Sequence, residues 1–330
     1  SNPASNVHPS VNSPPPTSAR CPDMRPTLSG RPLGTGKAGS VAWPAMTIKS
    51  VGILGSGIMG SGIAEVAAKT GHTVVLRSRK QETADAMLAS LEKSLTKQVE
   101  RGKLSEDDKA ATLGRVTATA LTGALADCDL IIESVVEDLA VKTELFTELD
   151  GVVKESAILA TNTSTLSVVN MAVVTERPDK VVGVHFFNPA PMMSLVEIIR
   201  PLTASDETVA EVTAFARTCG KDPVEVQDRA GFIVNALLFP YLNNAVRMLE
   251  NGTASRDDID TAMKGGCNFP MGPLALLDLV GLDTSLSILD ALYDEFRDPN
   301  YAAVPALRRM VTAGQLGRKS GLGFYDYTKK

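Results

Sequence analysis

The sequence is poor in the residues from which metal and redox sites are built. It has only three histidines and four scattered cysteines, namely Cys21, Cys128, Cys219 and Cys267. No two cysteines form a C-x-x-C pair, so neither a zinc site nor a dithiol redox motif is expected. Isolated thiols fit a reducing compartment, and the sequence therefore predicts a cytoplasmic protein without a bound metal.

Two classes of partner are also disfavoured by what is missing. No apolar run reaches the ~18 residues that a membrane-spanning helix needs, so no membrane contact is predicted. The net charge is −5, whereas nucleic-acid-binding proteins usually present a basic face. With 330 residues, 44% hydrophobic and 22% charged, the chain has the composition of a globular protein of two domains.

Residues 1–46 differ in composition from the rest of the chain. They are rich in Pro, Ser, Asn and Gly and hold few large apolar side chains, so they cannot bury enough surface to fold. We expect a disordered leader. A targeting peptide is the alternative, because basic residues outnumber the single Asp23, yet no amphipathic helix or apolar signal segment is present. Met46 would make a natural start for the folded protein.

From Thr47 onwards, strand and helix patterns alternate. Strands are predicted at 50–54, 73–76, 130–133, 157–161, 181–187, 196–199 and 224–226. Helices are predicted at 59–69, 81–112 with a break at 101–102, 141–150, 165–175 and 206–219. Such alternation predicts an α/β fold of the Rossmann type, with a doubly wound, mostly parallel sheet covered by helices on both faces.

After Gly231 the strand pattern stops. Residues 232–330 are predicted to form helices separated by Gly and Pro, and Ser255 followed by Asp258 resembles a capping box at a helix start. We therefore place a dinucleotide-binding domain at 47–230 and an all-helical domain at 231–330. The Leu, Met and Ile content of the helical domain predicts that it also forms a homodimer interface.

Gly55, Gly57 and Gly60 form a G-x-G-x-x-G turn between the first strand and the first helix. In this setting the three glycines serve a tight turn, close approach to a pyrophosphate, and packing of helix on strand. The helix N-terminus adds free N–H groups for the phosphates. We predict a nicotinamide dinucleotide here, in contact also with Ile58 and Met59. A glycine-rich turn without a ligand is the alternative.

The residues after the second strand depart from the usual NAD site, where an Asp or Glu accepts from the ribose 2′-hydroxyl. Here the strand runs into 76–80, Leu-Arg-Ser-Arg-Lys, with no carboxylate before Glu82. Ser78 cannot repel a 2′-phosphate and Arg79 could pair with one, which favours NADP(H). A solvated basic loop, with Ser78 bound to the 2′-hydroxyl of NAD(H), explains the residues equally well.

His185 is the histidine best placed for chemistry, since His8 lies in the leader and His72 in a predicted surface turn. Oxidation of an alcohol needs a base, and neutral imidazole suits that role near pH 7. Taken alone, a histidine among apolar neighbours is more often a core residue than a catalytic one. Glu197, in the next predicted strand, could however hold one ring N–H and leave the other nitrogen as the base.

Polar residues 161–165, Thr-Asn-Thr-Ser-Thr, follow another predicted strand. In an open α/β sheet, the carboxyl ends of the strands form the edge where ligands bind. The cluster is therefore a candidate part of the site, although turn formation alone would also explain it.

Eight segments carry a resemblance to a known family. They are GILGSGIMGSGIAEVAA (52–68), IESVVE (132–137), TNTSTLS (161–167), HFFNPAP (185–191), KDPVE (221–225), AGFIVN (230–235), FPMGPLALLDLVGLD (269–283) and GRKSGLGFYDY (317–327). Together they resemble the L-3-hydroxyacyl-CoA dehydrogenases, and most of all the short-chain bacterial 3-hydroxybutyryl-CoA dehydrogenases. The resemblance runs from about residue 48 to 328, essentially the whole folded part.

This resemblance implies hydride transfer between an (S)-3-hydroxyacyl-CoA and NAD(P), in either direction of fatty-acid metabolism. It implies His185 as the general base, Glu197 as its orienting partner, and Ser164 and Asn235 as ligands of the substrate oxygen. Residues that would line the cofactor site are Glu137, Lys142, Asn162, Asn188 and Lys319, besides Ser164. The family's acidic residue after the second strand corresponds to Ser78, which puts a strict preference for NAD in doubt.

Lys93, Lys97 and Arg101 recur every four residues and would lie on one helix face. The resemblance implies that this region binds coenzyme A, so we expect Lys93 and Lys97 to meet its phosphates. The alternative is a solvated face laced by nearby Glu residues.

Two other functions fit parts of the pattern. One is a dehydrogenase of the same fold that acts on a sugar acid or a free hydroxy acid. The other is a non-catalytic nucleotide-binding protein, which would be expected to lose Ser164, His185, Glu197 or Asn235, whereas all four are present.

Overall fold

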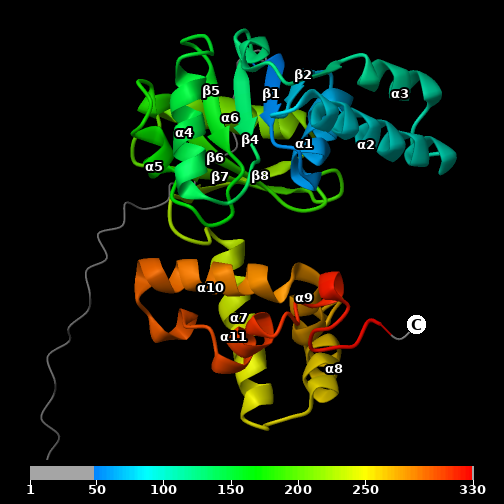
Figure 1. The fold of residues 1–330 in the computed structure, drawn as a ribbon, viewed down its shortest axis with the longest axis vertical. Coiled ribbons are helices and arrows are strands. Elements are labelled where there is room, and N and C mark those ends of the chain that lie inside the picture. Colours follow the sequence, from blue (N-terminus) through cyan, green and yellow to red (C-terminus); the bar gives the residue numbers. More distant parts are fainter. Residues whose placement is uncertain (1–47, 329–330) are drawn as a thin grey trace, which may run out of the picture. The chain divides into compact units, whose positions relative to one another are not determined.

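The structure is a computed structural model that describes residues 48–328, so the leader predicted at 1–46 lies outside the described residues. Its centre is an eight-stranded sheet of order β3-β2-β1-β4-β5-β6-β7-β8 (Figure 1). The strands are β1 Ser50–Leu54, β2 Thr73–Arg77, β3 Val116–Thr119, β4 Leu130–Glu133, β5 Ile158–Thr161, β6 Val181–Phe186, β7 Leu195–Arg200 and β8 Asp222–Gln227. All neighbours run parallel except β6 and β7, which confirms the predicted fold class.

Helices cover both faces of this sheet. They are α1 Ile58–Lys69, α2 Gln81–Glu100, α3 Glu106–Leu113, α4 Leu139–Asp150, α5 Val169–Ala172 and α6 Asp206–Thr218. Side chains of α1, α2 and α6 share one core with the sheet, and those of α4 and α5 share another. Adjacent strand residues enter opposite cores, as Ile53 and Leu54 do. The central strands are therefore apolar runs rather than alternating patterns.

The segment from 232 to 328 forms helices with a core of their own. They are α7 Val234–Glu250, α8 Arg256–Cys267, α9 Pro273–Val280, α10 Leu282–Phe296 and α11 Pro305–Thr312. No strand of the sheet comes from this segment, as predicted. Ser255 Oγ accepts from Asp258 N at the start of α8, where the cap was expected. None of the helices formed by residues 48–328 is long and apolar enough to cross a membrane.

Three local predictions were wrong or incomplete. The helix at 165–175 is reduced to Val169–Ala172, because Asp228 binds the backbone N–H groups of Val168 and Val169 from a distant part of the chain. His72 is buried rather than in a surface turn, since its ring packs edge-on against Phe215 of α6. The short strand β3 had not been predicted.

Candidate active site

The glycine turn has the geometry that its sequence predicts. Gly55 has a φ of +126°, and a Cβ built on it would lie 2.1 Å from the carbonyl oxygen of Ser134. A Cβ on Gly60 would lie 2.3 Å from the carbonyl oxygen of Gly55, so helix and strand pack through bare backbone. A Cβ on Gly57 would meet nothing within 4 Å. Space is thus open where a phosphate would approach, and Ile58 beside it is 77% exposed.

A cavity of about 650 Å³ lies beside this turn. It is bounded by the turn at 54–57, the end of β2 at Arg77, Ser78 and Arg79, the loop 134–136 after β4, and α4. β1 pairs with β2 on one side and β4 on the other, so the strand order reverses here. Ligands of open α/β sheets bind at such a switch point, and the bare glycine backbone fits a dinucleotide. This space is therefore called the cofactor cavity.

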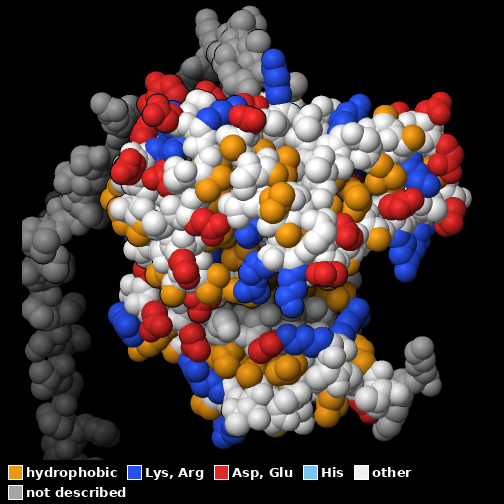
Figure 2. All heavy atoms as spheres, turned by 45° about the horizontal axis from the view of Figure 1, so that its top comes forward, with side chains coloured by type: hydrophobic (Ala, Val, Ile, Leu, Met, Phe, Trp, Pro, Cys, Tyr) orange, Lys and Arg blue, Asp and Glu red, His pale blue; other side chains and the backbone are white. Residues whose placement is uncertain are grey.

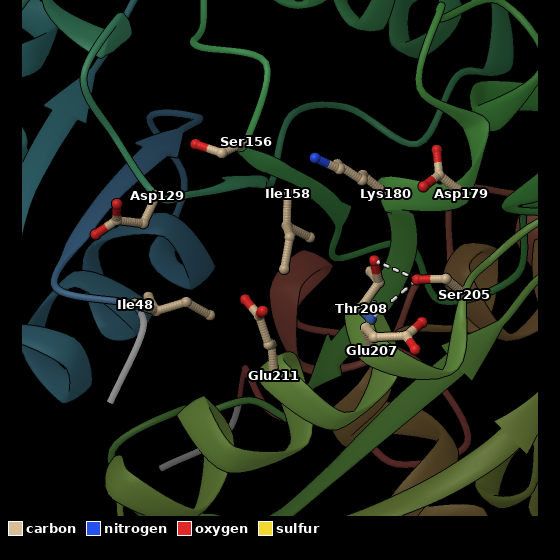
Figure 3. A pocket seen from close by; sticks show the side chains of 10 residues that line it. All are labelled: Ile48, Asp129, Ser156, Ile158, Asp179, Lys180, Ser205, Glu207, Thr208 and Glu211. Atoms are coloured by element: carbon tan, nitrogen blue, oxygen red, sulfur yellow. Dashed lines mark hydrogen bonds between the residues drawn. The ribbon is translucent and has the colours of Figure 1, made fainter. Parts of the chain in front are cut away.

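A second cavity, of about 510 Å³, lies at the opposite edge of the sheet (Figure 3). Its wall includes Ile48 and the polar residues that precede β4, β5 and β6. Asp129, Asp179, Glu207 and Glu211 surround it, with Lys180 as the one cation in the lining. Four carboxylates would repel the phosphates of a dinucleotide or of coenzyme A. The second cavity is therefore unsuited to either ligand.

His185 and Glu197 meet across the sheet. They are directly paired residues of β6 and β7, and His185 Nδ1 lies 2.8 Å from Glu197 Oε2. His185 is 7% exposed and packs against the rings of Phe187 and Phe232. Its Nε2 has no hydrogen-bond partner among residues 48–328. A carboxylate on Nδ1 assigns the ring proton to that nitrogen and leaves the lone pair on Nε2.

Glu197 also binds the helical segment that follows the sheet. Its other oxygen, Oε1, accepts from Ile233 N and Val234 N, both at 3.0 Å. These are amides at the start of α7, where a helix favours a negative charge. Asn235, in the first turn of the same helix, donates from Nδ2 to the carbonyl oxygen of Ser164 at 3.2 Å. The buried carboxylate thus fixes both the histidine ring and the helix that carries Asn235.

One oxygen of Glu137 organises the polar loop after β5. Oε1 lies 2.6 Å from Thr163 Oγ1, 2.8 Å from Ser164 N and 3.1 Å from Ser164 Oγ. Burial alone would raise the pKa of Glu137, but the Lys142 ammonium and these donors outweigh it and hold the pKa below its usual value. Glu137 therefore stays ionised and holds Ser164 in place at neutral pH.

Lys142 is completely buried rather than exposed to the cavity. Its Nζ donates to both oxygens of Glu133, at 2.7 and 2.9 Å, and lies 3.4 Å from Glu137 Oε2. Thr161 Oγ1, at 2.8 Å, and Val135 N, at 2.6 Å, also donate to Glu133. Lys142, expected to line the cofactor site, is not among the residues that line this cavity and instead binds Glu133 and Glu137.

The remaining predicted residues are more scattered. Asn162 accepts from Phe186 N at 2.8 Å and so ties the polar loop to β6. Asn188 is exposed, just after β6. Lys319 forms an ion pair with Asp283 and is not part of the cofactor cavity lining.

Lys93 and Lys97 lie on the exposed side of α2, opposite the buried Leu91 and Leu95. Neither lysine forms an ion pair among residues 48–328, so the alternative of a face laced by glutamates gains no support. Figure 2 shows basic and acidic side chains interspersed on the face of the molecule that it presents. Both ammonium groups are free to meet an anionic ligand.

Sequence reasoning missed several residues that position the site. Lys221 is buried and donates from Nζ to the carbonyl oxygens of Ala190 and Met193, at 2.6 and 2.8 Å. It therefore holds the loop that follows His185. Glu144 and Glu148 of α4 line the cofactor cavity, although neither was among the residues expected there. The sequence could have pointed to such positioning residues only where a charged residue stands inside a predicted strand or helix, as Glu133 does.

Family models match nearly all of the described chain. The model described as the NAD binding domain of 3-hydroxyacyl-CoA dehydrogenase matches residues 50–229, and that described as its C-terminal domain matches 231–327. The chain belongs to the 3-hydroxyacyl-CoA dehydrogenase family. The sequence-based assignment to this family is confirmed, and so is a nicotinamide-dependent oxidoreductase as the class of enzyme.

Individual members of the family are similar over almost their whole length. A 3-hydroxybutyryl-CoA dehydrogenase of Clostridioides difficile is 50% identical over 84% of this chain and 99% of its own. The mitochondrial hydroxyacyl-coenzyme A dehydrogenase of Sus scrofa is 42% identical over 90% of this chain and 97% of its own. The crystal structure of the (S)-3-hydroxybutyryl-CoA dehydrogenase of Ralstonia eutropha superposes with a TM-score of 0.84 at 43% identity, covering 86% of this chain and all of the other.

Proposed function

We propose that the protein interconverts (S)-3-hydroxyacyl-CoA and 3-oxoacyl-CoA, with 3-hydroxybutyryl-CoA as the preferred substrate, as a step of fatty-acid metabolism. The observation that carries the proposal is the His185–Glu197 pair, 2.8 Å apart beside the polar loop of Ser164. NAD(H), held at the glycine turn, supplies the hydride acceptor for this chemistry when it is bound.

His185 acts as the general base. In the oxidative direction its Nε2 takes the proton of the substrate hydroxyl, while the carbon that bears this hydroxyl gives up its hydride to the nicotinamide. Glu197 keeps Nδ1 protonated and stabilises the imidazolium that forms. In the reductive direction the same nitrogen returns the proton to the oxygen, so one arrangement serves both directions.

Ser164 and Asn235 act on the substrate oxygen. The Ser164 hydroxyl donates to Glu137, which also binds the Ser164 amide, so the hydroxyl can turn to a ligand while the loop stays in place. Asn235 Nδ2 uses one proton on Ser164 O and keeps a second for a ligand. Two donors aimed at one oxygen stabilise the charge that develops there.

Two features extend the proposal to the cofactor and to coenzyme A. Ser78 carries no charge and Arg79 is exposed at the cavity, so we expect NADP(H) to be accepted beside NAD(H). Lys93 and Lys97 would pair with coenzyme A phosphates from the exposed face of α2.

We also propose a homodimer in the cytoplasm, formed through the helical segment. Large apolar side chains stay exposed there, including Leu237 at 72%, Leu279 at 50%, Met248 at 44% and Phe269 at 43%. Partly exposed apolar patches on a folded chain mark association surfaces. Among the described residues Cys128, Cys219 and Cys267 are unpaired thiols, in keeping with a reducing compartment.

The function is tested by following oxidation of NADH with acetoacetyl-CoA and, in parallel, with free acetoacetate. We expect turnover of the thioester and a kcat/KM for the free acid lower by more than about a hundredfold, because the acid lacks the contacts to coenzyme A. Comparable rates for the two compounds would favour a free hydroxy acid dehydrogenase. No turnover of either would contradict the proposed reaction.

A further inference from the structure

The cofactor cavity contains negative charge that the end of β2 does not supply. Glu144 and Glu148 project from consecutive turns of α4 and line the cavity together with Arg77, Ser78 and Arg79. In a usual NAD site the carboxylate that meets the ribose 2′-hydroxyl follows the second strand. Here that position is Ser78, and the carboxylates come from the opposite wall.

Glu148 is connected to the end of β2 by hydrogen bonds. Its Oε1 accepts from Thr122 Oγ1 at 3.0 Å, and the same hydroxyl oxygen accepts from Arg77 Nη2 at 2.9 Å. Glu144 forms no hydrogen bond or ion pair among residues 48–328. Only Glu148 is therefore held next to the basic residues that would attract a 2′-phosphate.

This chain of contacts has two effects on a 2′-phosphate. The negative charge of Glu148 repels the phosphate, and it partly neutralises Arg77, which already gives one donor to Thr122. A 2′-hydroxyl is uncharged and can donate to a carboxylate, so the same residue does not oppose NAD(H). Of the two arginines in the cavity lining, only Arg79, which is exposed, is therefore free to attract the phosphate without this link to Glu148.

We propose that Glu148, linked through Thr122 to Arg77, sets the preference of this cavity for NAD(H) over NADP(H) in place of the missing acid at Ser78. The proposal rests on the binding of the dinucleotide in this cavity, which is part of the proposed function. It assigns cofactor discrimination to α4, a helix that the glycine motif does not include.

Binding can be measured without catalysis by using nucleotides that lack nicotinamide. Titration calorimetry with ADP-ribose and with 2′-phospho-ADP-ribose would compare the wild type with Glu148→Gln. Removing the charge should tighten binding of the 2′-phosphorylated compound about tenfold and change ADP-ribose binding less than about threefold. Because a charge effect is screened, the gain should shrink as KCl is raised. Glu148 is exposed, so the substitution should leave the fold intact.

Glu144→Gln and Glu211→Gln are matched controls. Glu144 lines the cofactor cavity, whereas Glu211 lines the second cavity at the amino edge of the sheet. Glu144→Gln should change the ratio of the two affinities much less than Glu148→Gln, and Glu211→Gln should leave it unaltered. An unchanged ratio in Glu148→Gln, or an equal change in Glu144→Gln, would overturn the proposal. If the wild type bound neither ADP-ribose nor its 2′-phosphate, both the proposal on Glu148 and the placement of the cofactor in this cavity would be overturned. Normal nucleotide binding without acetoacetyl-CoA turnover would contradict the reaction alone.

Discussion

The two edges of the sheet carry cavities of similar volume, about 650 and 510 Å³, but their helix termini differ. At the carboxyl edge, α1 begins with no side-chain cap and no acidic residue in its first turn. At the amino edge, α6 begins with Ser205 as its cap and with Asp206 and Glu207 in its first turn. Of these two helix starts, only that of α1 has first-turn N–H groups without a side-chain cap or an acidic neighbour, as the binding of a phosphate requires. Volume alone therefore does not identify the site, whereas unsatisfied donors and charge do.

Removing a carboxylate should lower kcat at the carboxyl edge and leave it unchanged at the amino edge. Glu197→Gln takes away the charge that orients His185, and kcat should fall on the order of 10²–10⁴-fold, as when a triad carboxylate is neutralised. Glu211→Gln at the amino edge should leave kcat unaltered. Steady-state kinetics on both variants would decide the matter, and a normal kcat in Glu197→Gln would show that the edges do not differ in this way.

The glycine turn allows a test that separates folding from binding. Gly57→Ala places its Cβ in open space, with φ at −83°, so thermal stability should not change while NADH affinity falls by about tenfold or more. Gly55→Ala instead meets the Ser134 carbonyl oxygen at a positive φ and should lower the melting temperature. Calorimetry and thermal denaturation measure the two effects. Unimpaired NADH binding by Gly57→Ala would mean that the cofactor does not approach this turn.

A smaller effect is expected further from the reacting atoms. Lys97→Glu reverses a charge on the exposed face of α2, and KM for acetoacetyl-CoA should rise about fivefold to tenfold with little change in kcat. Lys264→Glu, a lysine in the helical segment, serves as the control for net charge. If both variants gave the same KM, the α2 face would not bind coenzyme A.

The smallest effect concerns stability at the amino edge, where His72 precedes β2. Burial lowers the pKa of His72 below 6.5, so the folded protein keeps the imidazole neutral while the unfolded chain takes up a proton. Stability should therefore fall as the pH decreases through about 6.5 towards the lower, folded value. In His72→Gln this part of the decline should vanish, a difference of under about 4 °C in melting temperature between pH 7.5 and 5.5. Identical pH profiles would show that His72 does not titrate in this way.

Most strands were predictable because each is marked locally by its own short run of mostly apolar residues. Central strands such as 50–54 and 130–133 are mostly apolar, and the predicted bounds of both agree with the structure. The neighbourhood of His185 and Glu197 followed from two successive strands, and it is confirmed by their pairing. Their catalytic roles, like those of Ser164 and Asn235, stay predictions.

Long-range hydrogen bonds explain what could not be predicted. The helix expected at 165–175 is shortened because Asp228, about sixty residues away, takes its backbone donors. The burial of Lys142 depends on Glu133 and Glu137 surrounding one ammonium, which spacing along the chain does not reveal. The carboxylates at the cofactor cavity come from Glu144 and Glu148 of α4 and not from the end of β2, so a motif restricted to one strand and its turn could not find them.

The most direct test of the account is His185→Gln, assayed for acetoacetyl-CoA reduction by NADH and for NADH binding in the absence of substrate. If His185 moves the proton, kcat should fall on the order of 10²–10⁴-fold, while the Kd for NADH should stay within about twofold of the wild-type value. A near-normal kcat in a variant that binds NADH normally would contradict the central claim that the carboxyl edge of the sheet carries the base.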